Sequence, residues 1–253
     1  MQRAWLSVLA FVFLSGICPS EIKASKPNIL MIIVDDLRPQ LGCYGHKETY
    51  SPNIDRIAAE GTLFENAYVQ VPVCGASRAS LMTGLYPTAD RFVTYYSSVN
   101  IDAPEIIDIP GHLKSHGYST TSNGKIYHQK EDCTNSWDEI SRPADFRVYL
   151  DPDKAEARAA YEYEDVEDDA YPSGKMANKI IQDLQSAKKT GQPFFITAGF
   201  TKPHLPFIAP KKYWDLYRPV SINLAKNPYA PKGVPKQATV SYTHLTLPTT
   251  EAV

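Results

Sequence analysis

Ile29-Leu30-Met31-Ile32-Ile33-Val34-Asp35-Asp36 joins an uninterrupted apolar run to two adjacent carboxylates. An apolar run of this length, rich in β-branched residues, predicts a parallel strand that is buried on both faces. Ligands of open α/β sheets bind at the carboxyl ends of the strands, where Asp35 and Asp36 lie. Two neighbouring carboxylates repel each other, so the pair predicts a hard divalent cation with oxygen ligands. The alternative is that one aspartate caps a turn and the other is solvated.

A second informative stretch, Cys74-Gly75-Ala76-Ser77-Arg78, follows a proline-containing turn. It opens a helical run that continues through Thr83 and stops at Gly84. Unpaired N–H groups and the helix dipole at a helix start favour negative charge, so this position suits a thiolate or a bound sulfate or phosphate. The pentapeptide alone is a weak signal.

Strand and helix patterns alternate along the rest of the chain, which predicts a doubly wound α/β fold with a mostly parallel sheet flanked by helices. Lys125 and His128 follow one predicted strand, and Lys202 and His204 follow another, so the candidate polar residues are expected along one sheet edge. The predicted strands are 62–69, 118–122 and 194–199, and the predicted helices are 52–60, 110–116 and 175–189.

The acidic stretch from Asp151 to Tyr171 predicts a solvated surface insertion. A calcium site in this stretch is the weaker alternative, because the ligand spacing and glycine of a calcium loop are missing. The net charge of −2 provides no case for nucleic-acid binding.

Both ends of the chain require a separate interpretation. Residues 1–24 have the charged, apolar and small-residue regions of a secretory signal peptide, with an apolar region too short to span a membrane. We therefore expect an exported protein (periplasmic or extracellular, or lysosomal in a eukaryote) with no membrane association after signal removal. Residues 25–240 form the expected domain, and residues 241–253 are interpreted as a non-native tail resembling sequencing-adapter sequence.

Removal of the leader would leave three cysteines, Cys43, Cys74 and Cys133. An odd number in an exported protein predicts at least one cysteine outside any internal disulfide. Pairing of Cys43 with Cys133 and burial of both as free thiols remain open alternatives.

Six ordered motifs between about residues 26 and 236 make the chain resemble the sulfatases of the alkaline-phosphatase superfamily, in particular the iduronate-2-sulfatase branch. The motifs are Pro27-Asn28 through Arg38-Pro39, Leu41-Gly42-Cys43-Tyr44-Gly45, Ser51-Pro52-Asn53-Ile54-Asp55, Cys74-Gly75-Ala76-Ser77-Arg78, Gly124-Lys125-Ile126-Tyr127-His128 and Lys202-Pro203-His204-Leu205-Pro206-Phe207. Six matches in the family's order are far more specific than any one of them. The resemblance implies an N-terminal, incomplete sulfatase catalytic domain.

The resemblance also implies a mechanism for hydrolysing sulfated sugars or polysaccharides. A formylglycine-generating enzyme would convert Cys74 to formylglycine, whose hydrate offers one hydroxyl for attack on sulfur and a second for releasing sulfate. Asp35, Asp36 and the modified Cys74 would bind one divalent ion, expected to be Ca²⁺.

The resemblance assigns further roles to basic side chains. Arg78 would hold the hydrate, and Lys125 and His128 would contact sulfate and the nucleophile. His204 is the candidate for protonating the leaving group, and Lys202 is a candidate for substrate contact.

The sequence departs from the family pattern at Ala76, where proline is usual, and at Leu85, where arginine is common. The family's second metal-ligand pair and a later lysine belong beyond residue 240. We therefore expect the 253-residue chain as printed to bind metal poorly and to be inactive. Two alternatives remain: a phosphodiesterase or phosphonate hydrolase of the same superfamily, and a non-catalytic relic that binds sulfated glycans.

Overall fold

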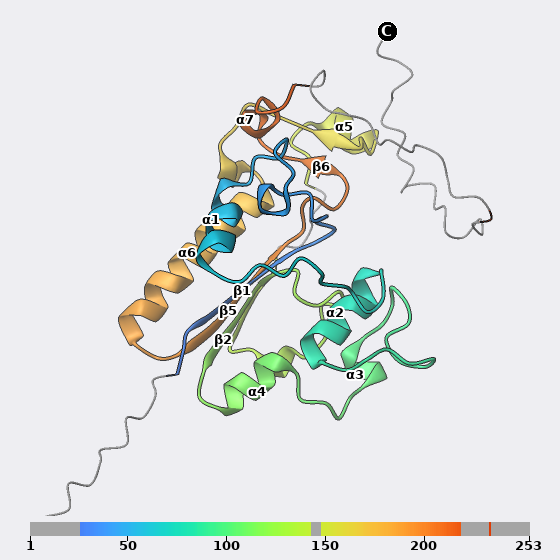
Figure 1. Cartoon of the computed structure of the whole chain (residues 1–253), viewed down its shortest axis with the longest axis vertical. Coiled ribbons are helices and arrows are strands. Elements are labelled where there is room, and N and C mark those ends of the chain that lie inside the picture. Colours follow the sequence, from blue (N-terminus) through green and yellow to red (C-terminus); the bar gives the residue numbers. More distant parts are fainter. Residues whose placement is uncertain (1–25, 143–147, 219–232, 234–253) are drawn as a thin grey trace, which may run out of the picture.

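The computed structural model describes residues 26–142, 148–218 and 233 (Figure 1). The expected signal peptide at 1–24 and the expected tail at 241–253 lie outside these residues. Among the helices of the described part, none combines the length and apolar character needed to cross a membrane.

The described residues contain a four-stranded sheet in which every neighbouring pair is parallel, in the order β1-β5-β2-β3. Its strands are β1 (Ile29–Val34), β5 (Phe194–Phe200), β2 (Ser119–Gly124) and β3 (Glu139–Ser141). In the register, Val34 pairs with Phe200 and Gly124 with Gly199, so the carboxyl ends of three strands lie side by side. The predicted parallel sheet is therefore confirmed.

Helices cover both faces of this sheet, as Figure 1 shows. On one face, Met176 and Ile180 of α6 (Pro172–Thr190) pack with Ile196 and Ala198 of β5. Full burial of one such side chain contributes about 1.5–3 kcal/mol. The opposite face carries α2 (Cys74–Thr83) and α4 (Ile109–Ser115).

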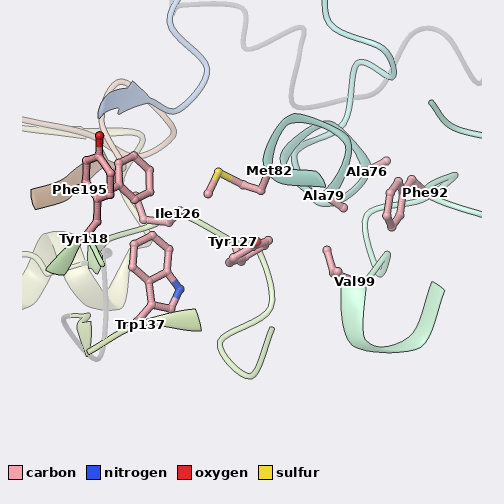
Figure 2. Packing of buried hydrophobic residues seen from close by; sticks show 10 residues of the cluster. All are labelled: Ala76, Ala79, Met82, Phe92, Val99, Tyr118, Ile126, Tyr127, Trp137 and Phe195. Atoms are coloured by element: carbon pink, nitrogen blue, oxygen red, sulfur yellow. The ribbon is translucent and has the colours of Figure 1, made fainter. Parts of the chain in front are cut away.

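The larger hydrophobic cluster lies on the α2 face (Figure 2). Ala76, Ala79 and Met82 of α2 belong to one cluster with Ile126 and Tyr127 of the loop after β2 and with Phe195 of β5. All three α2 residues are almost fully buried. Cys74 is thus attached to a helix whose packing fixes its direction relative to the sheet.

The remaining elements are short, apart from a three-turn helix at 52–60. They are η1 (Gly42–Tyr44), α1 (Pro52–Glu60), α3 (Val99–Asp102), η2 (Thr134–Ser136), α5 (Pro152–Glu156), β4 (Tyr161–Glu162), η3 (Asp168–Ala170), β6 (Phe207–Ile208) and α7 (Lys211–Trp214). β4 and β6 form a separate parallel pair. The predicted helices at 52–60, 110–116 and 175–189 correspond to α1, α4 and α6 within a few residues.

Two strand predictions were wrong in the described residues. β1 is not buried on both faces: it lies at the edge of the sheet, and Leu30 and Ile32 are 42% and 52% exposed. The segment 62–69 forms no strand. Its Phe64 and Tyr68 are exposed to solvent. The segment has no neighbouring strand in the described residues, and β-propensity alone does not form a strand without one.

The acidic stretch is largely exposed, as predicted, with one exception. Glu162 is fully buried. Its carboxylate accepts hydrogen bonds from the backbone N–H groups of Leu150 and Asp151 and from the Tyr171 hydroxyl. These hydrogen bonds offset the cost of burying the carboxylate. They also connect the two ends of the insertion, at Asp151 and Tyr171.

The cysteines of the described residues, Cys43, Cys74 and Cys133, are all free thiols. Cys43 and Cys133 are therefore unpaired, but both are half-buried rather than buried as the second alternative expected.

Candidate active site

Charged residues from separate segments converge at the carboxyl edge of the sheet. Asp35 immediately follows β1, and its N–H donates to the Phe200 carbonyl of β5 at 2.9 Å. Lys125 immediately follows β2, and its N–H donates to the Gly199 carbonyl at 2.9 Å. A side chain at Gly199 would clash, because its Cβ would lie 2.2 Å from the Lys125 carbonyl oxygen. Glycine thus allows the two strand ends to approach closely.

Asp35 forms the centre of a buried ion network. Its Oδ1 accepts from Arg78 Nη2 at 2.8 Å, and its Oδ2 accepts from Lys125 Nζ at 2.5 Å. All three side chains are less than a tenth exposed. Burial raises the pKa of Asp35, but Arg78 and Lys125 outweigh burial and hold this pKa below its usual value. The network combines one carboxylate with two cations and therefore retains positive charge.

Arg78 also connects helix α2 to the loop after β2. Its Nη1 donates to the carbonyl of Lys125 and, at 2.9 Å, to that of Ile126. Arg78 lies one helical turn from Cys74, so the two side chains share a face of α2. The guanidinium consequently fixes α2, the Lys125 loop and Asp35 relative to one another.

Cys74 is the first residue of α2 and contacts His128. The distance from Cys74 Sγ to His128 Nδ1 is 3.2 Å. Gly75 permits a close backbone approach, since a Cβ there would lie 2.1 Å from the Tyr95 carbonyl oxygen. The Tyr95 ring in turn packs edge-on against His128, with 4.3 Å between ring centroids.

His128 is uncharged at neutral pH. Burial lowers its pKa to about 4, and the neighbouring cations Lys125 and Arg142 add to the shift. A neutral imidazole keeps one ring nitrogen as an acceptor, so His128 can accept a proton from a group at position 74.

Asp36 and His204 lie at the outer side of this edge. Asp36 adopts a left-handed backbone conformation with φ of 57°, which aspartate tolerates better than most residues. Its side chain is 58% exposed, and its Oδ2 lies 3.9 Å from His204 Nε2. Asp35 thus contacts the buried cations, whereas the Asp36 side chain is largely exposed.

Lys202 belongs to the same edge, after β5. Its Nζ donates to the carbonyls of His204 and Pro206, at 3.1 and 2.6 Å. These bonds brace the turn that carries His204.

The carboxylate oxygens of Asp35 and Asp36 match the preference of a hard divalent cation. In residues 26–142 and 148–218, however, no group of three or more His, Cys, Asp or Glu side chains could hold a metal ion. The described residues therefore do not form a complete cation site by themselves.

Sequence patterns did not identify Arg142, which directly follows β3. Its guanidinium donates to the carbonyls of Tyr127 and His128, both at 3.1 Å. β3 is only three residues long and lacks an apolar run, so no strand was predicted before Arg142. Its position after a strand, like that of Lys125 after β2, is the signal that could have revealed it.

Comparisons with known proteins find related sequences and structures. A family model described as Sulfatase matches residues 27–245. The chain is 35% identical to iduronate 2-sulfatase of Homo sapiens over 256 residues, which covers 92% of this chain and 46% of the relative. The chain spans about half the length of the curated relatives it matches.

Solved structures share the fold. One, in complex with its substrate D-glucosamine-2-N,6-O-disulfate, superimposes with a TM-score of 0.56 at 26% identity over 71% of this chain and 35% of that chain. The phosphonate monoester hydrolase of Agrobacterium radiobacter superimposes with a TM-score of 0.61 at 22% identity over 79% of this chain and 45% of that chain. At this identity the second comparison shows a common fold only.

Proposed function

The chain belongs to the sulfatase family, and we propose that the protein hydrolyses sulfate esters of sugars at the carboxyl edge of its parallel sheet. One observation carries this proposal: Cys74 Sγ lies 3.2 Å from neutral His128, beside a buried carboxylate shared by Arg78 and Lys125. A nucleophile, a proton acceptor and a positive environment for an anionic ester thus meet in one place.

Each residue has a proposed part in this reaction. Formylglycine formed from Cys74 by a formylglycine-generating enzyme would supply the hydrated nucleophile, and His128 would accept its proton. Lys125 and Arg78 would offset the charge of the sulfate group, while Asp35 keeps both cations in place. His204 is the proposed acid for the leaving oxygen, and Lys202 orients its turn.

The cation and the destination of the protein are part of the same proposal. Asp35 and Asp36 would contribute to a Ca²⁺ site completed by oxygen ligands outside the described residues. Export would follow from the signal-like segment 1–24.

Modification of Cys74 is the first test. After co-expression with a formylglycine-generating enzyme, mass spectrometry of the peptide containing residue 74 is expected to find an aldehyde in place of the thiol. Cys43→Ala serves as the control, because it removes a different thiol and should leave the modification unchanged. An intact Cys74 thiol in every preparation would contradict the proposed nucleophile.

Substrate class is the second test. Rates of hydrolysis are compared on an aryl sulfate, the matching aryl phosphate and a phosphonate monoester, and the ratio of rates decides. Faster sulfate release supports the proposal, whereas faster cleavage of the aryl phosphate or the phosphonate monoester favours the related hydrolases. The printed chain is expected to be inactive, so absence of turnover alone does not decide. Binding of sulfated glycan by a protein whose Cys74 stays unmodified would instead identify a binding protein.

A further inference from the structure

A small cavity lies beside the buried ion network, and apart from Lys125 and Lys202 its lining residues have no part in the proposed reaction. Its volume is about 50 Å³, several times the roughly 10–15 Å³ that one water molecule requires. The lining comes from the ends of β2 and β5, the start of α6, the residue after β3, a loop residue and β6. The residues are Gly124, Lys125, Arg142, Val148, Pro172, Ser173, Met176, Thr201, Lys202 and Ile208. The cavity therefore opens on the sheet edge where α/β proteins bind ligands.

The chemical character of this lining is cationic. Lys125, Arg142 and Lys202 contribute three positive side chains, and the hydroxyls of Ser173 and Thr201 add hydrogen-bonding capacity. None of the described residues lining the cavity is acidic. Such a lining is suited to an oxyanion rather than to a neutral or cationic group.

Arg142 has the strongest geometric argument for anion binding. The two hydrogen bonds from its guanidinium go to backbone carbonyls, which are uncharged and leave the positive charge of Arg142 in place. A guanidinium has five N–H donors, so donors remain for a further acceptor. Burial, followed by the nearby Arg78, lowers the pKa of Arg142, and the carboxylates of Glu131 and Asp35 partly offset this shift.

The buried carboxylate that contacts Lys125 of this lining does not balance these charges. Asp35 is already shared by Arg78 and Lys125, so one negative charge faces two positive charges before Arg142 is considered. An added anion at the cavity would reduce the repulsion among these cations.

We propose that the cavity between Arg142, Lys125 and Lys202 is a second oxyanion subsite, which binds a carboxylate or a second sulfate of the sugar whose sulfate ester is cleaved. This inference rests on the proposed function, since it requires an anionic sugar at the adjacent site. It makes Arg142 a specificity-determining residue that selects sugars carrying two negative groups.

The test compares two pairs of ligands in calorimetric titrations. The first pair is a 2-O-sulfated uronic acid disaccharide and its carboxyl methyl ester, and the second is a glucosamine disulfate and the corresponding monosulfate. Arg142→Gln is expected to weaken binding of the dianionic members roughly tenfold or more and to change the others less than about twofold. The pair that responds identifies the anion as carboxylate or sulfate.

Lys188→Gln is the matched control. It removes one positive charge from the exposed last turn of α6, about 24 Å along the helix from Pro172 beside the cavity. This variant should bind all four ligands with the same affinity as the protein of wild-type sequence. Equal weakening of monoanionic and dianionic ligands by Arg142→Gln would overturn the inference, because it would indicate a general disturbance of the His128 loop.

A second measurement needs no variant. Crystals soaked in selenate are expected to show an anomalous peak between Arg142, Lys125 and Lys202. Absence of that peak, together with unchanged ligand selectivity in Arg142→Gln, would overturn the subsite. If selenate occupies the cavity but no sulfate ester binds or reacts, the proposed function fails and the anion site stands. If monosulfates bind but Arg142→Gln does not change the selectivity for dianionic ligands, the anion subsite fails and the proposed function stands.

Discussion

Replacement of Asp35 by asparagine is the perturbation that tests the buried ion network most directly. Asparagine has nearly the same shape but no charge, so Asp35→Asn would leave Arg78 and Lys125 buried beside each other without a counter-ion. Their side chains are 5% and 7% exposed, so water cannot replace the lost carboxylate.

The expected cost follows from this burial. Removal of one partner from a buried ion pair typically costs about 3–5 kcal/mol, because the remaining charge is uncompensated. Here two cations lose their shared partner, which places Asp35→Asn at the upper end of that range. A domain is stable by only about 5–15 kcal/mol, so the loss should be readily measured.

Lys125→Met should cost less than Asp35→Asn, because Asp35 keeps its bond to Arg78. In the double variant Asp35→Asn/Lys125→Met, only Arg78 remains charged, so its cost should fall below the sum of the two single costs by about 1 kcal/mol or more. This ordering distinguishes an electrostatic network from simple loss of packing.

Urea unfolding followed by tryptophan fluorescence measures these differences. Lys211→Met is the control, since the Lys211–Asp215 pair has a similar distance of 2.6 Å but exposed fractions of 44% and 59%. Its expected cost is much smaller, because water solvates both charged groups. A cost for Asp35→Asn no larger than that of Lys211→Met, or strict additivity in the double variant, would refute the reasoning.

The pH dependence of the same comparison has a defined sign. The pKa of Asp35 is lowered in the folded state relative to its unfolded value near 3.8. Its stabilising contribution is therefore present above pH 3.8 and is lost as the pH falls through the folded pKa. The difference in unfolding free energy between the wild-type sequence and Asp35→Asn should consequently narrow in strong acid. Unfolding curves at a series of pH values would measure it.

Three further predictions concern groups around the site. Gly75→Ala should lower the melting temperature, at a cost of about 1–3 kcal/mol, because the new Cβ would lie 2.1 Å from the Tyr95 carbonyl oxygen; calorimetry showing no change would contradict this contact. Burial, followed by the charge of Asp108, raises the pKa of the Cys133 thiol to about 12 from 9.0. Alkylation of Cys133, mapped by mass spectrometry, should therefore be slow at pH 8 and accelerate in urea. The contribution of this shift to folding stability is present below pH 9 and should disappear as the pH rises toward 12. Glu162→Gln should cost about 1–3 kcal/mol in thermal unfolding, whereas exposed Glu156→Gln should be nearly neutral; equal effects would show that the buried carboxylate is not needed.

Sequence patterns were most informative where a structural element depends on local chemistry. The apolar run at 29–34 became β1 with the predicted bounds, and the periodic segment at 175–189 became the centre of α6. The helical run predicted at 77–83 lies within α2, which begins earlier, at Cys74. Its predicted end was confirmed, since Gly84 adopts the left-handed conformation that ends a helix.

Long-range contacts limited what the same patterns could predict. The exposure of Leu30 and Ile32 depends on β1 lying at the edge of the described sheet, and strand order is set by pairing between distant segments. Burial of Glu162 likewise depends on donors brought to it by the fold, which its acidic neighbours in sequence do not reveal.

The sequence by itself determined which residues would end the strands, because apolar runs and the polar residues after them are local features of the chain. It therefore placed Asp35, Lys125 and Lys202 at one edge of a parallel sheet. Only the tertiary structure decided how these charges are paired: Arg78 and Lys125 share Asp35, His128 contacts Cys74, and Arg142 joins them from β3. Electrostatic energies depend on distance and burial in three dimensions, and a linear pattern contains neither.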